Sequence, residues 1–130
     1  MRILVPIDGS DCSFRALEFG ADMAPRYDAT LHVVHVTDSR DEATDAILSR
    51  ARDVLDANDV DDEPTVHTDI GLDFRPAKRV GKDIVDIVED EGYDHVVMGH
   101  HGAGSVERAI LGSATETVMA ADRVPVTVVP

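Results

Sequence analysis

The sequence is poor in lysine, cysteine and long apolar runs, and each shortage excludes a class of protein. Lys78 and Lys82 are the only lysines, and 12 basic residues stand against 26 acidic ones, for a net charge of -14. A surface with that balance repels the phosphates of nucleic acids and anionic lipids, so neither is an expected partner. The single cysteine, Cys12, can form no disulfide within the chain, which excludes a disulfide-stabilised scaffold.

The lack of long apolar runs predicts a cytoplasmic protein. No run approaches the roughly 18 residues that a membrane span needs. The opening MRILVPIDGS reaches Asp8 too soon to contain the apolar core of a secretory signal. Abundant carboxylates with almost no lysine also indicate adaptation to high salt, because the Debye length falls from about 8 Å at physiological ionic strength to about 3 Å at 1 M. We therefore expect a halophilic source with an acidic proteome.

A chain of this length is expected to form one domain, residues 1–130. Its hydrophobic fraction of 43% is sufficient for a buried core. Short continuous apolar runs alternate with amphipathic stretches of helical period, which indicates buried strands alternating with helices. The predicted strands are 2–7, 30–36, 65–70, 93–98 and 124–129, and the predicted helices cover 13–24, most of 41–57, the stretch from about Val80 to Gly92, and about 114–122.

This alternation predicts an α/β three-layer sandwich around a five-stranded parallel sheet with right-handed crossovers. The first, second and fourth strands are the most continuously apolar, so they are expected to be central. The third strand alternates between apolar and polar residues, and the fifth has Pro125 near its start, so both fit the edges. The order 3-2-1-4-5 satisfies these constraints. The flavodoxin-like order 2-1-3-4-5 would bury the polar third strand and ranks lower.

The strand order predicts where a ligand binds. In open parallel sheets, ligands bind beyond the carboxyl ends of the strands, where the chain order reverses. For the order 3-2-1-4-5, that point lies between the first strand, which ends in VPIDGS, and the fourth, which ends in MGHHG. The stretch MGHHGAGSVERAILGSATETV, residues 98–118, contains Gly99, Gly102, Gly104 and Gly112. Topology and glycine content therefore predict the same site.

The start of the last helix has the chemistry of an anion site. Ser113 and Glu116 have the spacing of a capping box, with Ser113 as the N-cap. Amides and the helix dipole at a helix N-terminus attract anions, and Gly112 lets a phosphate approach the main chain closely. The stretch lacks the lysine of a G-x-x-x-x-G-K-[ST] loop, so a phosphate here depends on amides, a hydroxyl and a divalent cation. Glycines at such positions also serve as plain turn formers and caps, and spacing alone does not decide between these roles.

Several single residues have a structural interpretation beside a functional one. Asp8 either caps the turn after the first strand or contacts a ligand. His100 and His101 are expected to be solvated loop residues, and His35 a satisfied core histidine. The acidic run 59–62 is expected to form a solvated face.

The spacing Gly99, two residues, Gly102, nine residues, Gly112 and Ser113 matches the motif G-2x-G-9x-G-[ST] without a gap. In this the chain resembles the ATP-binding branch of the universal stress proteins. ILVPIDGSDCSFRALEFG resembles the opening of that family, LHVVHV its second strand, and YDHVVMGHHG with LGSATETVMAADRVPVTVV its closing third. The resemblance covers essentially the whole chain.

The resemblance implies a sheet of order 3-2-1-4-5 and a homodimer assembled through the last strand. It implies that ATP binds at the predicted site, and the charge of the chain favours Mg²⁺ or Mn²⁺ as a counter-ion held through the phosphates. The residues implied at this site are Pro6, Ile7 and Asp8 around the adenine, the main chain of Val36 and Met98 beside the base, Gly99 by the ribose, and Gly102, Gly112, Ser113 and the Ala114 amide at the phosphates.

Two features depart from the family pattern. The segment GLDFRPAKRVGKDIVDIV is longer than the usual entry to the third helix, so residues 72–82 are expected to form a local insertion. The histidines between the first two glycines take no role from the resemblance.

The leading functional hypothesis is a regulatory, stress-response protein that binds ATP and an unidentified protein partner. The alternative is a slow ATP hydrolase or phosphotransferase, with Asp8 as the best candidate base. The motif region supplies no obvious general base and no lysine where charge would develop, so no catalytic residue is assigned.

Overall fold

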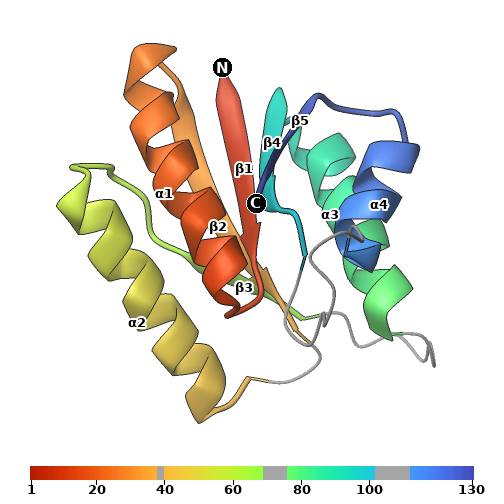
Figure 1. Cartoon of the computed structure of the whole chain (residues 1–130), viewed down its shortest axis with the longest axis horizontal. Coiled ribbons are helices and arrows are strands. Elements are labelled where there is room, and N and C mark those ends of the chain that lie inside the picture. The colour runs from red at the N-terminus through yellow and green to blue at the C-terminus, as the bar shows by residue number, and fades with distance from the viewer. Residues whose placement is uncertain (38–39, 69–75, 102–111) are drawn as a thin grey trace.

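The computed structural model describes residues 1–37, 40–68, 76–101 and 112–130. Strands and helices alternate along the chain, as the sequence predicts (Figure 1). Within the described part of the chain, every helix is too short or too polar to span a bilayer. The elements are β1 (Arg2–Ile7), α1 (Asp11–Arg26), β2 (Thr30–Val36), α2 (Glu42–Ala57), β3 (Thr65–His67), α3 (Pro76–Glu91), β4 (His95–Gly99), α4 (Ser113–Ala120) and β5 (Val126–Val129).

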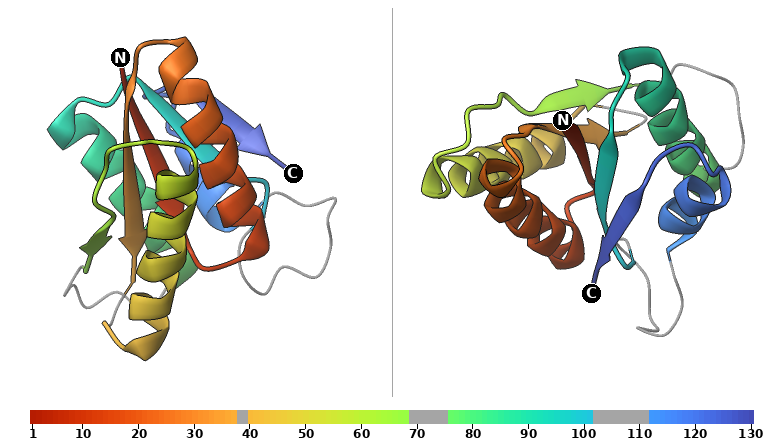
Figure 2. Two further views of the ribbon diagram at one scale, coloured as in Figure 1. Left: turned by 90° about the vertical axis from the view of Figure 1, so that its left-hand side faces the viewer. Right: turned by 90° about the horizontal axis from the view of Figure 1, so that it is seen from above.

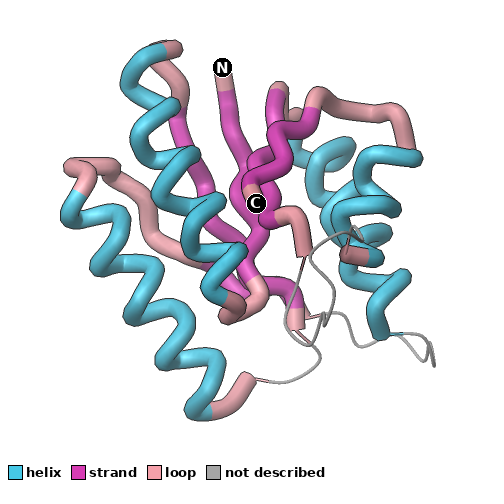
Figure 3. Tube along the Cα trace, viewed as in Figure 1, coloured by secondary structure: helices cyan, strands magenta, loops and turns pink. Residues whose placement is uncertain are grey.

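The five strands form one parallel sheet in the order β3-β2-β1-β4-β5, which confirms the predicted fold class and topology. β1 lies at the centre and pairs with β2 from Arg2 opposite Thr30 to Ile7 opposite His35. The chain order reverses between β1 and β4, so their carboxyl ends form the switch point of the sheet. In Figure 3 the strands run downward from the N-terminus, and these ends lie at the lower edge.

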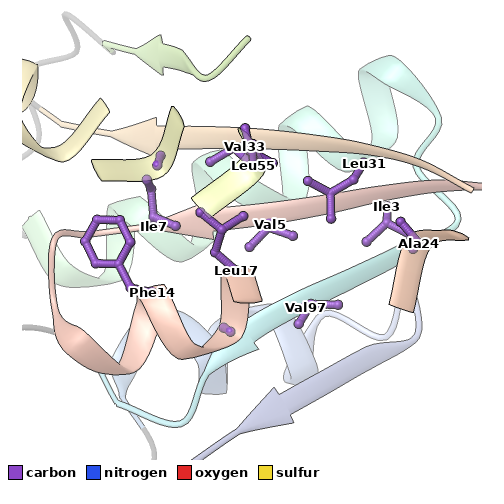
Figure 4. Packing of buried hydrophobic residues seen from close by; sticks show 12 residues of the cluster. Ile3, Val5, Ile7, Phe14, Leu17, Ala24, Leu31, Val33, Leu55 and Val97 are labelled. Atoms are coloured by element: carbon purple, nitrogen blue, oxygen red, sulfur yellow. The ribbon is translucent and has the colours of Figure 1, made fainter. Parts of the chain in front are cut away.

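Helices cover both faces of the sheet. Seen from above, α1 and α2 lie on one face, and α3 and α4 lie on the other (Figure 2). Successive side chains of β1 point to opposite faces of the sheet, as in any β-strand, so they pack into two different cores. Ile3, Val5 and Ile7 pack against Phe14 and Leu17 of α1 and Leu55 of α2 (Figure 4), and Leu4 belongs to the second core with Val96, Ile84 and Val118.

Burial on both faces explains why the central strands were predictable. Ile3, Leu4 and Val5 are fully buried, and each such side chain contributes roughly 1.5–3 kcal/mol through the hydrophobic effect. No polar alternation is therefore possible in β1. β3 and β5 occupy the edges, as expected, and all four residues of β5 are only half-buried.

Three strands are shorter than predicted. β4 begins at His95 because the turn that ends α3 includes Tyr93, whose amide donates to the carbonyl of Val88 in α3 at 3.2 Å. β5 begins at Val126, directly after Pro125, which has no amide to donate to a neighbouring strand. β3 ends at His67, Thr68 lies beyond the strand, and the last two residues of the predicted range, 69–70, lie outside the described residues.

Two helix predictions also differ from the structure. The first helix was predicted to end at residue 24, but α1 continues through Pro25 to Arg26, with Tyr27 as its C-cap and Asp28 in the left-handed region at φ 50°. The predicted insertion at 72–82 is helical from Pro76 onward, and residues 72–75 lie outside the described residues. Pro76 occupies the first helical position, where the missing amide costs nothing.

The acidic run is not uniformly solvated, which corrects the expectation for 59–62. The Asp62 side chain is only 13% exposed. Its Oδ2 accepts the Val33 amide of β2 at 2.9 Å, and its Oδ1 lies 3.0 Å from Nδ1 of His32. β3 pairs with β2 only from Val34 onward, so Asp62 bonds a β2 amide that lies before that pairing begins.

Candidate functional site

The turn after β1 is held in one shape by Asp8, Gly9 and Ser10. Oδ1 of Asp8 accepts hydrogen bonds from the Ser10 amide at 2.9 Å and from the Ser10 hydroxyl at 2.5 Å. Gly9 has φ +86°, a conformation that favours glycine, and a Cβ there would lie 2.7 Å from Cδ1 of Ile47 in α2. The main chain at the end of β1 is therefore fixed by its own side chains and by α2.

The first turn of α1 continues this turn directly. Ser10 is the N-cap, and its Oγ accepts the Ser13 amide at 3.1 Å. The Ser13 hydroxyl donates to the Ser10 carbonyl at 2.8 Å and accepts the Asp8 amide at 3.3 Å. Asp8, the candidate base of the hydrolase hypothesis, thus uses Oδ1 to hold the turn in which it lies.

Gly99 ends β4 directly against the first turn of α1. A Cβ at this position would lie 2.9 Å from Sγ of Cys12 and 3.1 Å from its carbonyl carbon, both closer than ordinary van der Waals contact. Cys12 is 2% exposed, and its thiol donates to the Val129 carbonyl of β5 at 3.4 Å. The first glycine of the motif is therefore required by close packing, whatever it contacts in a ligand.

The start of α4 is tied to the end of β4 by two hydrogen bonds. The Gly112 amide donates to the His100 carbonyl at 2.9 Å, and the Thr115 hydroxyl donates to the Gly99 carbonyl at 2.8 Å. The His100 amide in turn donates to the Val129 carbonyl at 2.6 Å. β4, β5 and α4 therefore meet at one point of the carboxyl edge.

Gly112, not Ser113, is the N-cap of α4, which corrects the predicted capping box. Gly112 is extended, with φ -60° and ψ 147°, and as a glycine it makes no side-chain cap hydrogen bond of its own. Its amide bonds to His100, and its carbonyl accepts the Glu116 amide at 2.9 Å, so the helix begins at Ser113. A glycine N-cap supplies no side-chain acceptor of its own for the amides of the first turn, and amides at a helix N-terminus are oriented to donate to an anion.

The structure gathers the described candidate residues at the carboxyl edge. Pro6 and Ile7 are buried in β1, Met98 is buried in β4, and Ser113 is exposed at the start of α4. Gly102 lies outside the described residues. Half-buried are Asp8 after β1, Val36 at the end of β2, Gly99 at the end of β4, and Gly112 and Ala114 at the start of α4.

The histidines near this edge differ in environment. His35 is buried, with Nδ1 2.7 Å from the Ile7 carbonyl, which makes Nδ1 the protonated nitrogen and confirms a satisfied core histidine. His100 and His101 are half-buried, not fully solvated, and their rings stand perpendicular at 6.0 Å between centroids. Across the described ranges, no three His, Cys, Asp or Glu side chains come together to hold a metal ion.

Thr115 and Cys12 are structural residues of this site that the sequence did not identify. In SATETV a threonine in the third position of a helix has no pattern that distinguishes a buried hydroxyl from an exposed one. Cys12 is buried, but its contact with Gly99 joins residues far apart in the sequence. Neither the hydrogen bond from Thr115 to Gly99 nor the contact of Cys12 with Gly99 can be recognised in the local sequence.

Comparisons with known proteins show which family the chain resembles in sequence. The model of the universal stress protein family matches residues 1–130. Universal stress protein MJ0531 of Methanocaldococcus jannaschii is 28% identical over 147 residues, covering 98% of this chain and 81% of that protein.

Solved structures agree in fold. A universal stress protein in complex with cAMP superposes with a TM-score of 0.77 at 23% identity, covering 100% of this chain and 96% of the other. The universal stress protein of Archaeoglobus fulgidus in complex with dAMP gives a TM-score of 0.76 at 22% identity, covering 100% and 98%. The matched sequence model and the shared sheet order together assign the chain: it belongs to the universal stress protein family.

Proposed function

We propose that this protein binds ATP at the carboxyl edge of the sheet, between the ends of β1 and β4, and acts as a regulatory stress-response protein. The observation that carries the proposal is the start of α4: a glycine N-cap with no side-chain cap, tied to the end of β4 and followed by the exposed Ser113. Amides and a hydroxyl in this arrangement form a donor set for phosphate oxygens.

The site divides into two parts that suit the two ends of a nucleotide. The base would lie against Pro6, Ile7 and Asp8, beside the main chain of Val36 and Met98, because these residues are at the ends of three adjacent strands. The phosphates would lie at Gly102, Gly112, Ser113 and the amide of Ala114, with Gly99 between the two parts. Two proteins of the same fold are complexes with adenine nucleotides, cAMP and dAMP, which supports a nucleotide at this edge.

A divalent metal, Mg²⁺ or Mn²⁺, would bind through the phosphates. The chain carries a net charge of -14, so an ATP polyanion needs a counter-ion here. The described residues contain no cluster of three side-chain ligands, which leaves phosphate oxygens as the main ligands of such an ion. Affinity for ATP is therefore expected to rise when either metal is added.

We also propose that the protein is a homodimer through β5. This strand is an edge of the sheet, and its four residues, Val126 to Val129, are half-buried. Exposed edge strands of this composition pair readily with another chain. Sedimentation equilibrium should give twice the chain mass for the wild type and a monomer for Val128→Lys; a monomeric wild type at both low and high KCl would contradict the dimer.

Gly112→Asp tests the phosphate part of the site, because Asp is a favourable N-cap at this φ and ψ. The substitution should leave stability unchanged or raise it by a few tenths of a kcal/mol, while its carboxylate accepts the amides that phosphate would use. ATP affinity measured by titration calorimetry should fall by at least about a hundred-fold.

Gly92→Asp is the matched control, since it adds the same charge just before β4, at the opposite edge of the sheet, in a left-handed position (φ +72°) that Asp tolerates. Equal ATP affinity in the wild type and Gly112→Asp would overturn the proposed site. ATP turnover well above background that Asp8→Asn abolishes would instead indicate a hydrolase.

A further inference from the structure

Thr115 is a buried polar residue whose hydroxyl bonds outside its own helix. Its side chain is 3% exposed, and its Oγ1 donates to the Gly99 carbonyl at 2.8 Å. Threonines in helices commonly donate instead to the carbonyl four residues earlier, as Thr117 does to Ser113 at 2.8 Å. Two threonines two positions apart in α4 thus make different hydrogen bonds, one local and one to β4.

The bond from Thr115 acts together with the bond from Gly112. Consecutive carbonyls at the end of β4, those of Gly99 and His100, accept from the Thr115 hydroxyl and the Gly112 amide. Both donors belong to the cap and first turn of α4. The two bonds therefore join residues on either side of 101–111 and set how the first turn of α4 lies against β4.

The amides of Ser113 and Ala114 lie in the same turn, between the two bonded residues. Hydrogen bonds to an anion weaken steeply when donor angle or distance departs from ideal geometry, so the orientation of this turn controls how well these amides bind phosphate. The glycine N-cap offers no side chain that could hold the turn in place. Thr115 is the side chain in the described part of α4 that bonds to the end of β4.

We propose that Thr115 is a positioning residue for phosphate: its hydroxyl, bonded to Gly99, orients the first turn of α4 so that the amides of Ser113 and Ala114 meet the phosphates of a bound nucleotide. This inference rests on the proposed nucleotide site. It predicts that Thr115 controls the affinity contributed by the phosphates and leaves that contributed by the nucleoside unchanged.

The test compares ATP with adenosine, by competition against a fluorescent ATP analogue, in the wild type and in variants of Thr115 and Thr117. Thr115→Val keeps the shape of the side chain and removes the donor, so ATP affinity should fall by about three- to ten-fold, with adenosine affinity within two-fold of the wild type. Thr115→Ser keeps the hydroxyl and should restore the ratio of ATP affinity to adenosine affinity. Thr117→Val, which removes the local bond in the same helix, is the matched control and should leave the ratio unchanged.

The ratio separates positioning from stability, because a loss of folded protein lowers both affinities together. If Thr115→Val does not fold, Thr115→Ala provides the same comparison with a residue of high helix propensity. An unchanged ratio in the folded variant, or an equal change in Thr117→Val, would overturn the positioning role while leaving the nucleotide site intact. Failure of the wild type to bind either compound would overturn the site and the inference together.

Discussion

The contact between Gly99 and Cys12 allows a prediction whose magnitude follows from the structure. In Gly99→Ala the new methyl carbon would lie 2.9 Å from Sγ of Cys12, 3.1 Å from its carbonyl carbon and 3.2 Å from its carbonyl oxygen. Ordinary contact begins at 3.4 Å, so the first turn of α1 and the end of β4 must separate. Overpacking of this kind costs about 1–3 kcal/mol, and replacing glycine within a strand returns roughly 0.5–1 kcal/mol. We expect a net loss of about 1–2 kcal/mol in the free energy of unfolding.

A double-mutant cycle tests whether the contact with Sγ of Cys12 causes part of this loss of stability. Cys12→Ala alone should cost about 1–2 kcal/mol, because it removes a buried Sγ and its bond to Val129. In the Cys12→Ala background, Gly99→Ala loses the contact with Sγ but keeps those with the backbone atoms. The cost of Gly99→Ala should therefore fall by about 0.5–1 kcal/mol, a partial rescue.

The assay is urea unfolding followed by circular dichroism at constant KCl concentration, with Gly92→Ala as the control. Among the described residues, no heavy atom lies within 4 Å of the methyl carbon that Gly92→Ala would add. This substitution therefore reports left-handed backbone strain alone, about 1–2 kcal/mol at φ +72°. Strictly additive costs in the cycle, or a Gly99→Ala variant as stable as the wild type, would refute the argument from close packing.

Two further predictions concern pH and salt. The hydrogen bond to Asp62 raises the pKa of His32, so the stabilisation is fully present below the unfolded pKa of about 6.5 and is lost as pH rises through the folded value. The free energy of unfolding of the wild type should therefore exceed that of Asp62→Asn most near pH 6, by up to about 1 kcal/mol, and the difference should narrow as pH rises through the raised pKa of folded His32. Burial lowers the pKa of His95, but that contribution is the same in both proteins and cancels. A gap that is constant with pH would contradict this role of the pair. If the net charge of -14 reflects adaptation to salt, the urea midpoint should rise steeply between 0.1 and 2 M KCl, and full stability at low salt would contradict it.

The parts of the fold that were predictable are those set by local pattern. β1 and β2 are apolar without interruption because helices cover both faces of the sheet, and their boundaries were correct to the residue. The edge positions of β3 and β5 followed from alternation and from Pro125. Strand order then located the switch point, and the glycine spacing independently located the same edge.

The parts that were missed depend on contacts between distant segments. Gly112 is the N-cap of α4 because its amide bonds to His100, whereas the local sequence favoured Ser113. In the sequence Asp62 is one of several acidic residues expected to be solvated, yet its carboxylate accepts a hydrogen bond from the Val33 amide of β2, before the pairing with β3 begins. The hydroxyl of Thr115 is directed to β4 by the packing of α4, which no helical pattern encodes.

The central claim is that the carboxyl edge between β1 and β4 binds an adenine nucleotide. Its most direct test is to denature the purified protein, assay released nucleotide, and titrate the nucleotide-free protein with ATP in the presence of Mg²⁺ or Mn²⁺. The account predicts stoichiometric binding of ATP, with an affinity that Gly112→Asp lowers by at least about a hundred-fold and Gly92→Asp leaves unchanged. No released nucleotide together with no ATP binding at any KCl or metal concentration would contradict it.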